Sequence, residues 1–206
     1  MNRFITQNIL TCTVLSLGLA LTGCLTDDKD DDNGGVTVGD SLSVKLVTVG
    51  AQENADFGSA LDADNMVAYK IADAKSRVAD IDLIYAVSTS GGGVVTNPAI
   101  YSPDSAKGGI NGSAGFTFLS DFNNPRHTDI KAFTMTEAGF NAINTKDKLD
   151  SLWLTTSLDA DGRIPLAAEG IFMAKSNQGK LVLIRVLSFT GTGTSNSASF
   201  KAQAKF

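Results

Sequence analysis

The chain is 206 residues long and carries 17 Lys plus Arg against 22 Asp plus Glu, a formal net charge of −5. Of these residues only Arg3, Lys29 and five Asp precede residue 36, which leaves 15 basic and 17 acidic residues in the 171 residues 36–206. A nearly neutral segment without a basic stripe excludes nucleic acid as a partner, because such binding depends on neutralising phosphates. The length suffices for one domain with its own hydrophobic core.

Residues 1–23 have the three parts of a secretory signal. Arg3 is the only charged residue, an apolar stretch runs from Ile9 to Leu21, and small residues follow it. We therefore predict a signal peptide that is removed. The alternative is an uncleaved anchor helix. It is disfavoured because hydroxyl residues interrupt the stretch, which falls short of the about 20 apolar residues that span a bilayer.

The sequence Leu21-Thr22-Gly23-Cys24 closes this leader. It resembles the lipobox of bacterial lipoproteins, with a leucine three residues before the cysteine and a small residue directly before it. The resemblance implies that Cys24 is the lipid attachment residue, carries palmitate-type acyl chains and begins the mature chain. Two or more acyl chains anchor a protein stably on a membrane. Because Cys12 leaves with the leader, the mature fold has no free thiol and no disulfide.

Residues 24–35 hold the cysteine and then five Asp against one Lys. Such a run repels itself and cannot bury apolar surface, which predicts a disordered acidic tether. In Gram-negative lipoproteins an Asp directly after the cysteine commonly retains the protein at the inner membrane, but Leu25 stands there. The cluster Asp27–Asp32 is similar to a surface-display signal of some groups, so the resemblance implies the cell outer membrane, facing the exterior. A solvated spacer without an address is the alternative.

Several strands are expected in the first half of the domain. Residues 36–49 alternate apolar with polar side chains, as half-buried antiparallel strands do, and residues 67–71 do the same. Residues 81–87 predict a further strand. Residues 94–101 contain a proline and are expected to form a short edge strand, and residues 105–113 a Gly-rich loop.

Two short helical segments are expected after a strand over residues 130–135. Thr136–Ile143 places Phe140 on the same face as Ile143, with Thr134 or Thr136 as the N-cap. A second turn of helix is expected over Lys146–Leu152. No pattern of alternating strands and helices occurs, so a parallel sheet is not expected.

The last 37 residues carry the clearest β pattern. Gly170–Lys175 and Lys180–Phe189 flank Ser176–Gly179, a short connection suited to a hairpin. Both faces of Lys180–Phe189 are apolar apart from Arg185, which predicts a central, buried strand. Ala198–Phe206 alternates, which predicts one face on the core and one in water.

Eight to ten short strands in one neutral domain predict a mainly β fold. We expect an antiparallel β-sandwich, jelly-roll or immunoglobulin-like, with one or two short helices. Residues 170–206 also resemble the C-terminal hairpin and closing strand of small β-sandwich lipoproteins of unknown function. The predicted domains are the signal peptide in 1–23, the lipidated cysteine with its tether in 24–35, and a single β-sandwich in 36–206.

No catalytic, cofactor-binding or metal-binding residue is predicted. His127 is the only histidine and is expected in a polar loop, without a known catalytic motif beside it. Asp159–Gly162 begins like a calcium loop. However, Arg163 stands where a third oxygen ligand belongs and Gly170 where a bidentate Glu belongs, so an ordinary turn is expected.

The sequence also argues against an obvious sugar site. Glycan-binding modules use exposed aromatic faces, whereas core packing explains the positions of Trp153 and the three tyrosines. Asp80 and Asp82 are expected on a solvated strand face rather than beside a sugar. We expect a non-enzymatic surface lipoprotein that binds an extracellular glycan or protein, without a cofactor. The alternative is a structural or assembly component of the cell envelope with no small-molecule ligand.

Overall fold

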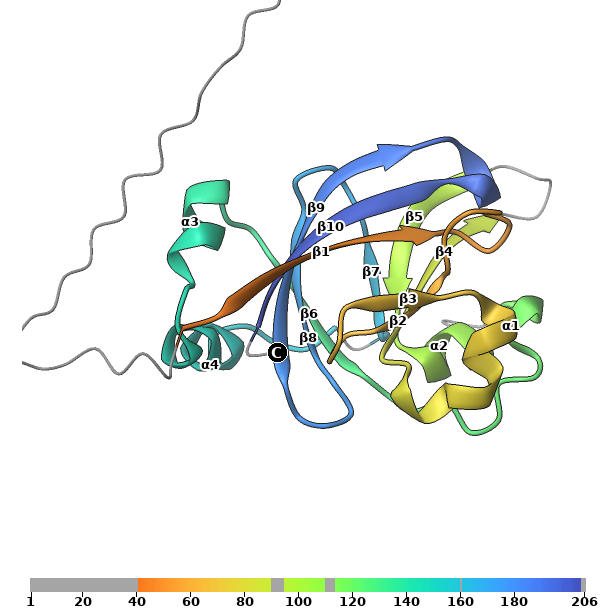
Figure 1. Ribbon diagram of the computed structural model, residues 1–206, viewed down its shortest axis with the longest axis horizontal. Helices are drawn as coiled ribbons and strands as arrows, with labels where there is room; N and C mark the ends of the chain where they lie inside the picture. Colours follow the sequence, from red (N-terminus) through yellow and green to blue (C-terminus); the bar gives the residue numbers. More distant parts are fainter. Residues whose placement is uncertain (1–40, 90–94, 110–113, 160, 205–206) are drawn as a thin grey trace, which may run out of the picture. The chain divides into compact units, whose positions relative to one another are not determined.

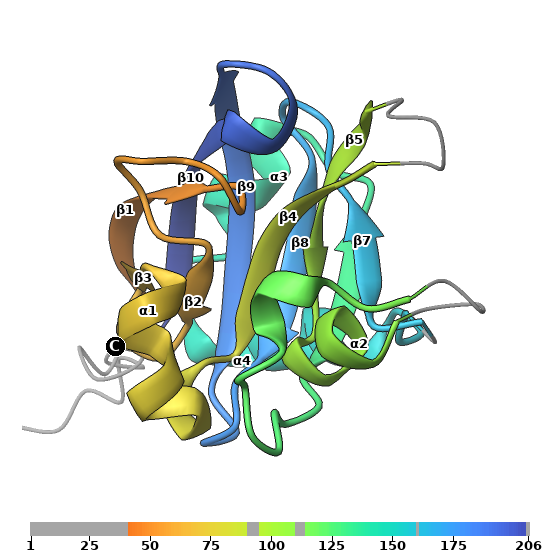
Figure 2. The same ribbon diagram turned by 90° about the vertical axis from the view of Figure 1, so that its right-hand side faces the viewer.

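The computed structural model describes residues 41–89, 95–109, 114–159 and 161–204, all within a compact unit that spans residues 37–206. The predicted signal peptide, Cys24 and the acidic tether lie outside the described residues. Figures 1 and 2 show two β-sheets packed face to face, with short helices on their outer sides. The predicted mainly β, antiparallel sandwich is confirmed.

Each sheet has five strands, and every pairing between neighbours is antiparallel. The first sheet has the order β1 (Ser43–Gly50), β10 (Ser197–Ala204), β9 (Leu181–Thr190), β8 (Ile171–Lys175), β6 (Asp129–Phe133). The second has the order β3 (Val67–Tyr69), β2 (Ala60–Asp62), β4 (Leu83–Thr89), β5 (Val95–Tyr101), β7 (Arg163–Pro165).

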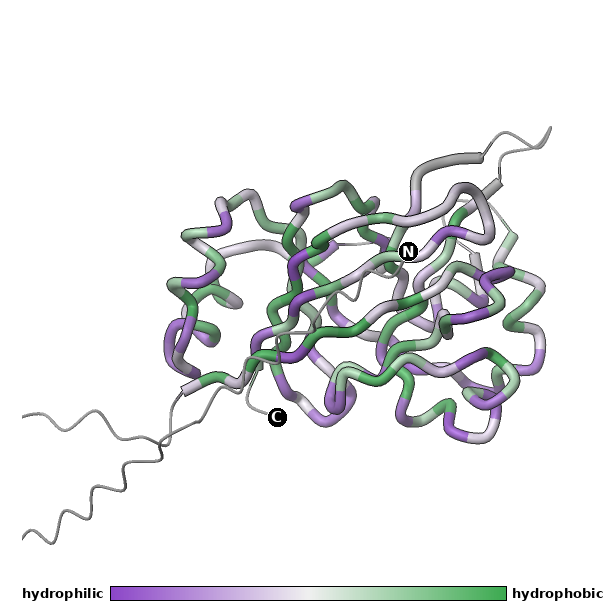
Figure 3. Tube along the Cα trace, turned by 45° about the horizontal axis from the view of Figure 1, so that its top comes forward, coloured by the Kyte–Doolittle hydropathy of each residue, from purple (hydrophilic) through white to green (hydrophobic). Residues whose placement is uncertain are grey.

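The main core fills the space between the sheets. Fully buried Phe200 of β10 lies in it, with its ring centroid 6.2 Å from that of Tyr85 in β4 and 6.0 Å from that of Phe172 in β8. Both contacts are edge-to-face, the arrangement that aromatic pairs prefer. In Figure 3 the strands in the middle of the molecule carry many hydrophobic residues, while hydrophilic ones are frequent in turns and helices. The inward-facing apolar residues of the strands therefore supply the core, and in β1 these are Val47 and Val49, whereas Val44 and Leu46 of the predicted apolar face are 51% and 71% exposed.

Short helices cover the outer faces. On the first sheet, α3 (Glu137–Ala142) and α4 (Lys146–Leu154) bury Phe140 and Leu149 against Met173 and Leu183. A second outer cluster covers the other sheet, from α1 (Ile71–Ala74), the 3-10 helices η1 (Lys75–Asp80) and η2 (Thr117–Leu119), and α2 (Pro103–Gly108). A third 3-10 turn, η3 (Gly193–Ser195), joins β9 to β10.

Several element predictions are confirmed. β9 is the third of five strands in its sheet, with apolar residues on both faces. The hairpin turn at Ser176 closes with a hydrogen bond from its N–H to the carbonyl of Lys180, 2.8 Å. Thr136 caps α3, since its hydroxyl accepts from the N–H of Gly139 at 3.2 Å. The helical turn predicted over residues 146–152 is α4 and ends two residues later.

Two segments differ from the expectation. Ile71 continues the apolar alternation of Val67 and Tyr69 but begins α1 instead of extending the strand, because a single apolar residue fits a helix as well as a strand. The predicted loop over residues 105–113 begins with α2, which starts at Pro103. Proline suits the first helical position because its φ is preset and its missing N–H would have no partner there. Gly109, with φ of 87°, ends the helix.

Two further expectations about strand positions are wrong. β5 lies between β4 and β7 instead of at an edge. Pro98 is compatible with this place because Ala99 pairs with Pro165, the last residue of β7, so Pro98 lies beyond that ladder. Gln203 of β10 is buried instead of in water, because α3 covers that end of the outer face. Phe206 lies outside the described residues.

Candidate functional site

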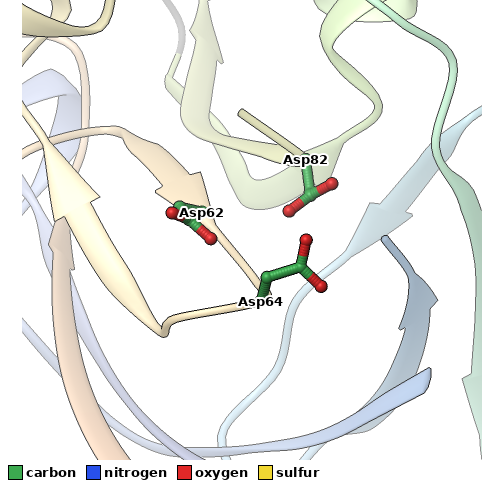
Figure 4. A group of neighbouring side chains, drawn as sticks. All are labelled: Asp62, Asp64 and Asp82. Carbon is green, nitrogen blue, oxygen red and sulfur yellow. The ribbon is translucent and has the colours of Figure 1, made fainter. Parts of the chain in front are cut away.

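Three aspartates meet at one end of the sandwich, where the two sheets come together (Figure 4). Asp62 is the last residue of β2, and Asp64 follows in the turn to β3. Asp62 holds this turn, because its Oδ1 accepts from the N–H of Asn65 at 3.0 Å and its Oδ2 from the Asn65 amide at 2.9 Å. Met66 completes the turn with a φ of 52°. The two carboxylates therefore come from one short connection.

Asp82 comes from the residue before β4, the neighbour of β2. Its N–H donates to the carbonyl of Leu61 at 3.0 Å, which extends the ladder by one residue. Its Oδ2 accepts from the N–H of Ala63 at 2.9 Å, and its Oδ1 from the N–H of Asn177 at 2.8 Å. The strand ladder thus aims this carboxylate at the turn that holds Asp62 and Asp64.

The β8–β9 hairpin of the other sheet closes the cluster. The hydroxyl of Ser176 donates to Oδ1 of Asp64 at 2.5 Å, and Ser176 is itself buried. The amide of Asn177 also donates to the carbonyl of Ala79. Because Ser176 and Asn177 belong to the first sheet's hairpin and the three aspartates to the second sheet, these bonds join the two layers.

The cluster is buried and acidic. One carboxylate oxygen from each aspartate lies within 4.8 Å of the others, and Asp62, Asp64 and Asp82 are only 4%, 3% and 0% exposed. The pKa of Asp82 is raised from 3.8 to about 6, chiefly by burial and to a smaller extent by the charges of Asp64 and Asp62, while the two backbone N–H groups oppose the shift.

The donor set is all oxygen, which is what hard cations such as Ca²⁺ use. The raised pKa of Asp82 favours its protonated form, and protonation would lower the repulsion among the three carboxylates. The expectation that Asp82 lies with Asp80 on a solvated strand face is wrong for Asp82, which is fully buried. Asp80 is exposed and ends η1, whereas Asp82 turns inward.

The only histidine lies in a polar loop, as predicted. Nδ1 of His127 is 2.9 Å from Oδ2 of Asp104 and 3.5 Å from the hydroxyl of Ser102. A Ser-His-Asp triad needs the serine and the carboxylate on opposite ring nitrogens. Here both face the same nitrogen. Ser102 is also fully buried, donates to Asp104 and accepts the N–H of Thr128, so its hydroxyl is not placed as a nucleophile.

Asp104 keeps its negative charge in this loop. Burial alone would raise its pKa, but hydrogen bonds from Ser102 and His127 outweigh that effect, and the pKa is lowered. Nε2 of His127 is 3.8 Å from Oδ1 of Asp129 on the other side of the ring. The histidine therefore bridges two carboxylates as a structural link.

The Trp and Tyr side chains form no flat exposed platform within the described residues. Tyr85 and Tyr101 are buried, and Tyr69 and Trp153 are half-buried. The guanidinium carbon of Arg77 lies 4.7 Å from the ring centroid of Tyr69. The ammonium nitrogen of Lys131 lies 4.2 Å from the ring centroid of Trp153. Cations therefore occupy ring faces that a sugar would need.

The predicted turn at Asp159 is present. Oδ1 of Asp159 accepts from the N–H of Asp161 at 3.1 Å and of Arg163 at 3.3 Å, and Gly162 has a φ of 62°. The side chain of Asp159 is thus directed at its own backbone. The sequence Asp159–Gly162 resembles Asp62–Asn65. Among the described residues, the carboxylate of Asp82 joins those of Asp62 and Asp64 as a third member. Asp62 and Asp64 lie two residues apart in the sequence, but only the pairing of β2 with β4 brings Asp82 to them.

Comparison with known proteins gives no relative: no family description, curated protein or solved structure matches this chain. Within the part of the chain that the structure describes, no helix is long and apolar enough to cross a membrane.

Proposed function

We propose that the protein is a lipid-anchored outer-membrane lipoprotein, displayed at the cell surface, whose β-sandwich is a non-enzymatic binding module. The observation that carries the proposal is Leu21-Thr22-Gly23-Cys24, which resembles a lipobox and directly precedes the acidic residues 27–32. Cys24 is the lipid attachment residue. Its acyl chains hold the protein on the membrane, since two or more chains suffice for stable anchoring.

The geometry around the single histidine supports a role without catalysis. Ser102 and Asp104 contact one nitrogen of His127, and the hydroxyl of Ser102 is buried. The acidic cluster that includes Asp62 is tied to backbone N–H groups and to Ser176. Neither group combines an accessible nucleophile with a general base, which hydrolytic chemistry needs.

The covered aromatic rings favour a protein over a glycan as the ligand. Sugar recognition relies on exposed aromatic faces, and Arg77 and Lys131 lie over those of Tyr69 and Trp153. The same observation favours the second candidate, a structural or assembly component of the envelope. A glycan array probed with the purified protein tests this preference: specific binding of one glycan class would reverse it.

Lipidation is tested by feeding cells an acyl-chain precursor and comparing the wild type with Cys24→Ala. We expect label and membrane association in the wild type only. Equal label in both proteins would refute the anchor.

Display at the surface is tested by adding protease to intact cells. We expect the domain to be cleaved in the wild type and protected when the five Asp of residues 27–32 are replaced by Ala. A protected wild type would place the domain on the inner side of the membrane.

A further inference from the structure

Four strands lie at the edges of the two sheets, and β1 is the longest of them. β1 has eight residues, whereas β3 and β7 have three each and β6 has five. The outer side of β6 is partly covered, because the carbonyl of Ile130 accepts from the N–H of Asp159 at 2.9 Å. β1 therefore offers the longest edge of backbone groups among the described strands, and such an edge pairs readily with a further strand.

A hydrogen bond just beyond β1 shows which of its backbone groups face outward. Ala51 donates its N–H to the carbonyl of Asn196, the residue before β10, at 2.7 Å. Successive residues of an antiparallel strand direct their N–H and C=O groups to opposite sides. The odd-numbered residues of β1 therefore face β10, and the even-numbered residues face away from it.

Other parts of the chain already fill both ends of the outward side. The N–H of Leu42 donates to the carbonyl of Asn144 at 3.0 Å, and the N–H of Gly50 donates to the carbonyl of Gly58 at 2.9 Å. Both donors are even-numbered, as the alternation requires. The chain at the first end also runs antiparallel to β1, through a bridge between residues 41 and 145. An incomplete strand thus lies beside β1, filled at its two ends.

We call residues 43–49, which lie between these ends, the open edge. Its outward backbone groups belong to Val44, Leu46 and Thr48. β10 lies along one side of β1, and no described strand of the same sheet lies along the other (Figure 1). Val44 and Leu46 are also 51% and 71% exposed, so an added strand would find apolar side chains beside it as well as backbone partners.

A second copy of this chain does not fit the open edge through its own β1. That strand has eight residues, Ser43–Gly50, and the chain continues beyond both ends, whereas the open edge has only the seven places 43–49. The chain at Asn144 and at Gly58 fills the places that the extra residues would need. The open edge therefore suits a short extended segment rather than a long strand.

The charge on β1 narrows the choice of partner. Lys45 is the only charged residue of the strand, and it shares a face with Val47 and Val49, which pack in the core between the sheets. Its ammonium bonds to the carbonyl of Asn65 at 3.1 Å. An inward-facing lysine disfavours pairing with an apolar strand, whereas a carboxylate directly opposite a lysine stabilises the pair. The charge therefore favours a segment with an acidic residue at that place.

We propose that the open edge binds a short extended segment of another protein, which adds as an antiparallel strand with apolar side chains beside Val44 and Leu46 and a carboxylate opposite Lys45. Main-chain hydrogen bonds supply the affinity in this mode of recognition, and alternate side chains supply the specificity. The inference rests on the proposed binding role of the sandwich, and it does not need the lipid on Cys24.

The test uses a defined probe, the capped seven-residue peptide Thr-Val-Thr-Val-Glu-Val-Thr with a fluorophore at one end. Placed antiparallel on residues 43–49, its central valine lies opposite Leu46 and its glutamate lies opposite Lys45. Fluorescence anisotropy with the full-length protein in mild detergent measures the binding. N-methylation of the central valine removes an N–H that faces β1, whereas N-methylation of the threonine before it removes one that faces away.

We expect methylation of the central valine to weaken binding at least about fivefold, the loss of one net hydrogen bond, and methylation of the threonine to leave binding nearly unchanged. Lys45→Glu should weaken binding at least about threefold, and a peptide with lysine in place of its glutamate should bind this variant better than it binds the wild type. Lys175→Glu is the control, because Lys175 is an exposed lysine at the end of β8, and it should leave binding unchanged.

No binding of the peptide at concentrations up to about 1 mM would overturn the proposal. Equal effects of the two methylations, or of the two lysine variants, would overturn it as well. Specific binding of a glycan without binding of the peptide would keep the binding role of the sandwich and overturn the open edge. None of these results bears on the lipid anchor or on surface display, which are measured by acyl label and by protease cleavage.

Discussion

The hydroxyl of Ser176 donates to a carboxylate oxygen of Asp64 at 2.5 Å, and this bond joins a hairpin of one sheet to a turn of the other. Asp64 also raises the pKa of Asp82 by its charge, after the larger effect of burial. One residue therefore both links the layers and adds repulsion to the buried acidic cluster.

The first prediction concerns this cluster and pH. The folded state raises the pKa of Asp82 from 3.8 to about 6, so it binds the proton more tightly than the unfolded chain does. The resulting stability is fully present below about pH 4 and is lost as the pH rises through about 6. Asp64→Asn removes a neighbouring charge, while its amide oxygen can still accept from Ser176. We expect it to stabilise the protein at pH 7.5, where Asp82 loses its proton, and by much less at pH 4.5, where Asp82 keeps it.

Urea melts at the two pH values measure this difference. Asp56→Asn is the control, because Asp56 is exposed and lies outside the cluster. An equal effect of Asp64→Asn at both pH values would show that charge repulsion among these carboxylates is not the cause of the change in stability.

The second prediction concerns Arg185, whose side chain is 8% exposed on β9. Its Nη1 is 2.6 Å from Oε1 of Glu137 in α3, and its Nη2 bonds to Glu169 before β8. Removing both glutamates leaves a buried cation without a partner, which is costly, whereas an apolar residue of similar length tolerates the site. We expect Glu137→Ala with Glu169→Ala to be markedly less stable than either single variant, and Arg185→Met added to that pair to restore most of the loss.

Urea midpoints of the single, double and triple variants give the answer. A triple variant no more stable than the double would mean that lost packing, rather than the unpaired charge, causes the destabilisation.

The third prediction concerns Phe200. It is fully buried between Tyr85 and Phe172, so Phe200→Ala should cost about 3 to 5 kcal/mol. That approaches the whole stability of many domains, about 5 to 15 kcal/mol. Ending the chain after Ser197 removes nearly all of β10, which lies between β1 and β9, and should leave the protein unfolded. Deleting residues 25–35 should leave the melting temperature unchanged.

Calorimetry of these variants checks the prediction, with Phe57→Ala as the exposed control, expected to cost under about 1 kcal/mol. A truncated protein as stable as its parent would contradict the role assigned to β10.

The fourth prediction concerns Gly58. A Cβ there would lie 2.1 Å from the carbonyl carbon of Tyr69 and 2.5 Å from the nitrogen of Lys70, both backbone atoms that cannot turn aside. Gly58→Ala should therefore destabilise by about 3 kcal/mol or more, the upper range for overpacking. Gly108→Ala is the matched control, because no atom lies within 4 Å of its added Cβ and it ends α2. In thermal melts we expect Gly58→Ala to lower the stability more than Gly108→Ala does. Equal losses of stability would contradict the close approach of Gly58 to the backbone of Tyr69 and Lys70.

Much of the fold could be predicted from the sequence where one physical rule dominates. Apolar residues on both faces of residues 181–187 indicate a central strand, and alternation in residues 198–204 indicates one face on the core. The side chain of Thr136 caps α3, as its position in the sequence indicates. Prediction failed where two rules give the same pattern. Ile71 continues an apolar alternation, yet the chain turns into α1, since a single apolar residue fits a helix as well as a strand.

The acidic cluster could not be predicted for a different reason. Asp62 and Asp64 belong to the same short connection between β2 and β3. Asp82 reaches them only because β4 pairs with β2, and Ser176 reaches them only because the two sheets pack face to face. Register and stacking are properties of the whole fold. Asp82 also follows Asp80 by two residues, and on a strand this spacing suggests one solvated face, which the change from η1 to β4 removes.

The pairing of β1 with β10 has a consequence for how the protein is made. The eight register pairs from Ser43 with Ala204 to Gly50 with Ser197 join the first and last strands of the described chain. A ribosome adds about 5 to 20 residues per second, so β10 is made about 8 to 30 s after β1, and no other described strand pairs with β1. During that interval Val47 and Val49 have no β10 to pair with, which exposes a strand prone to aggregation. Nascent chains arrested before Ala204 should therefore depend on chaperones.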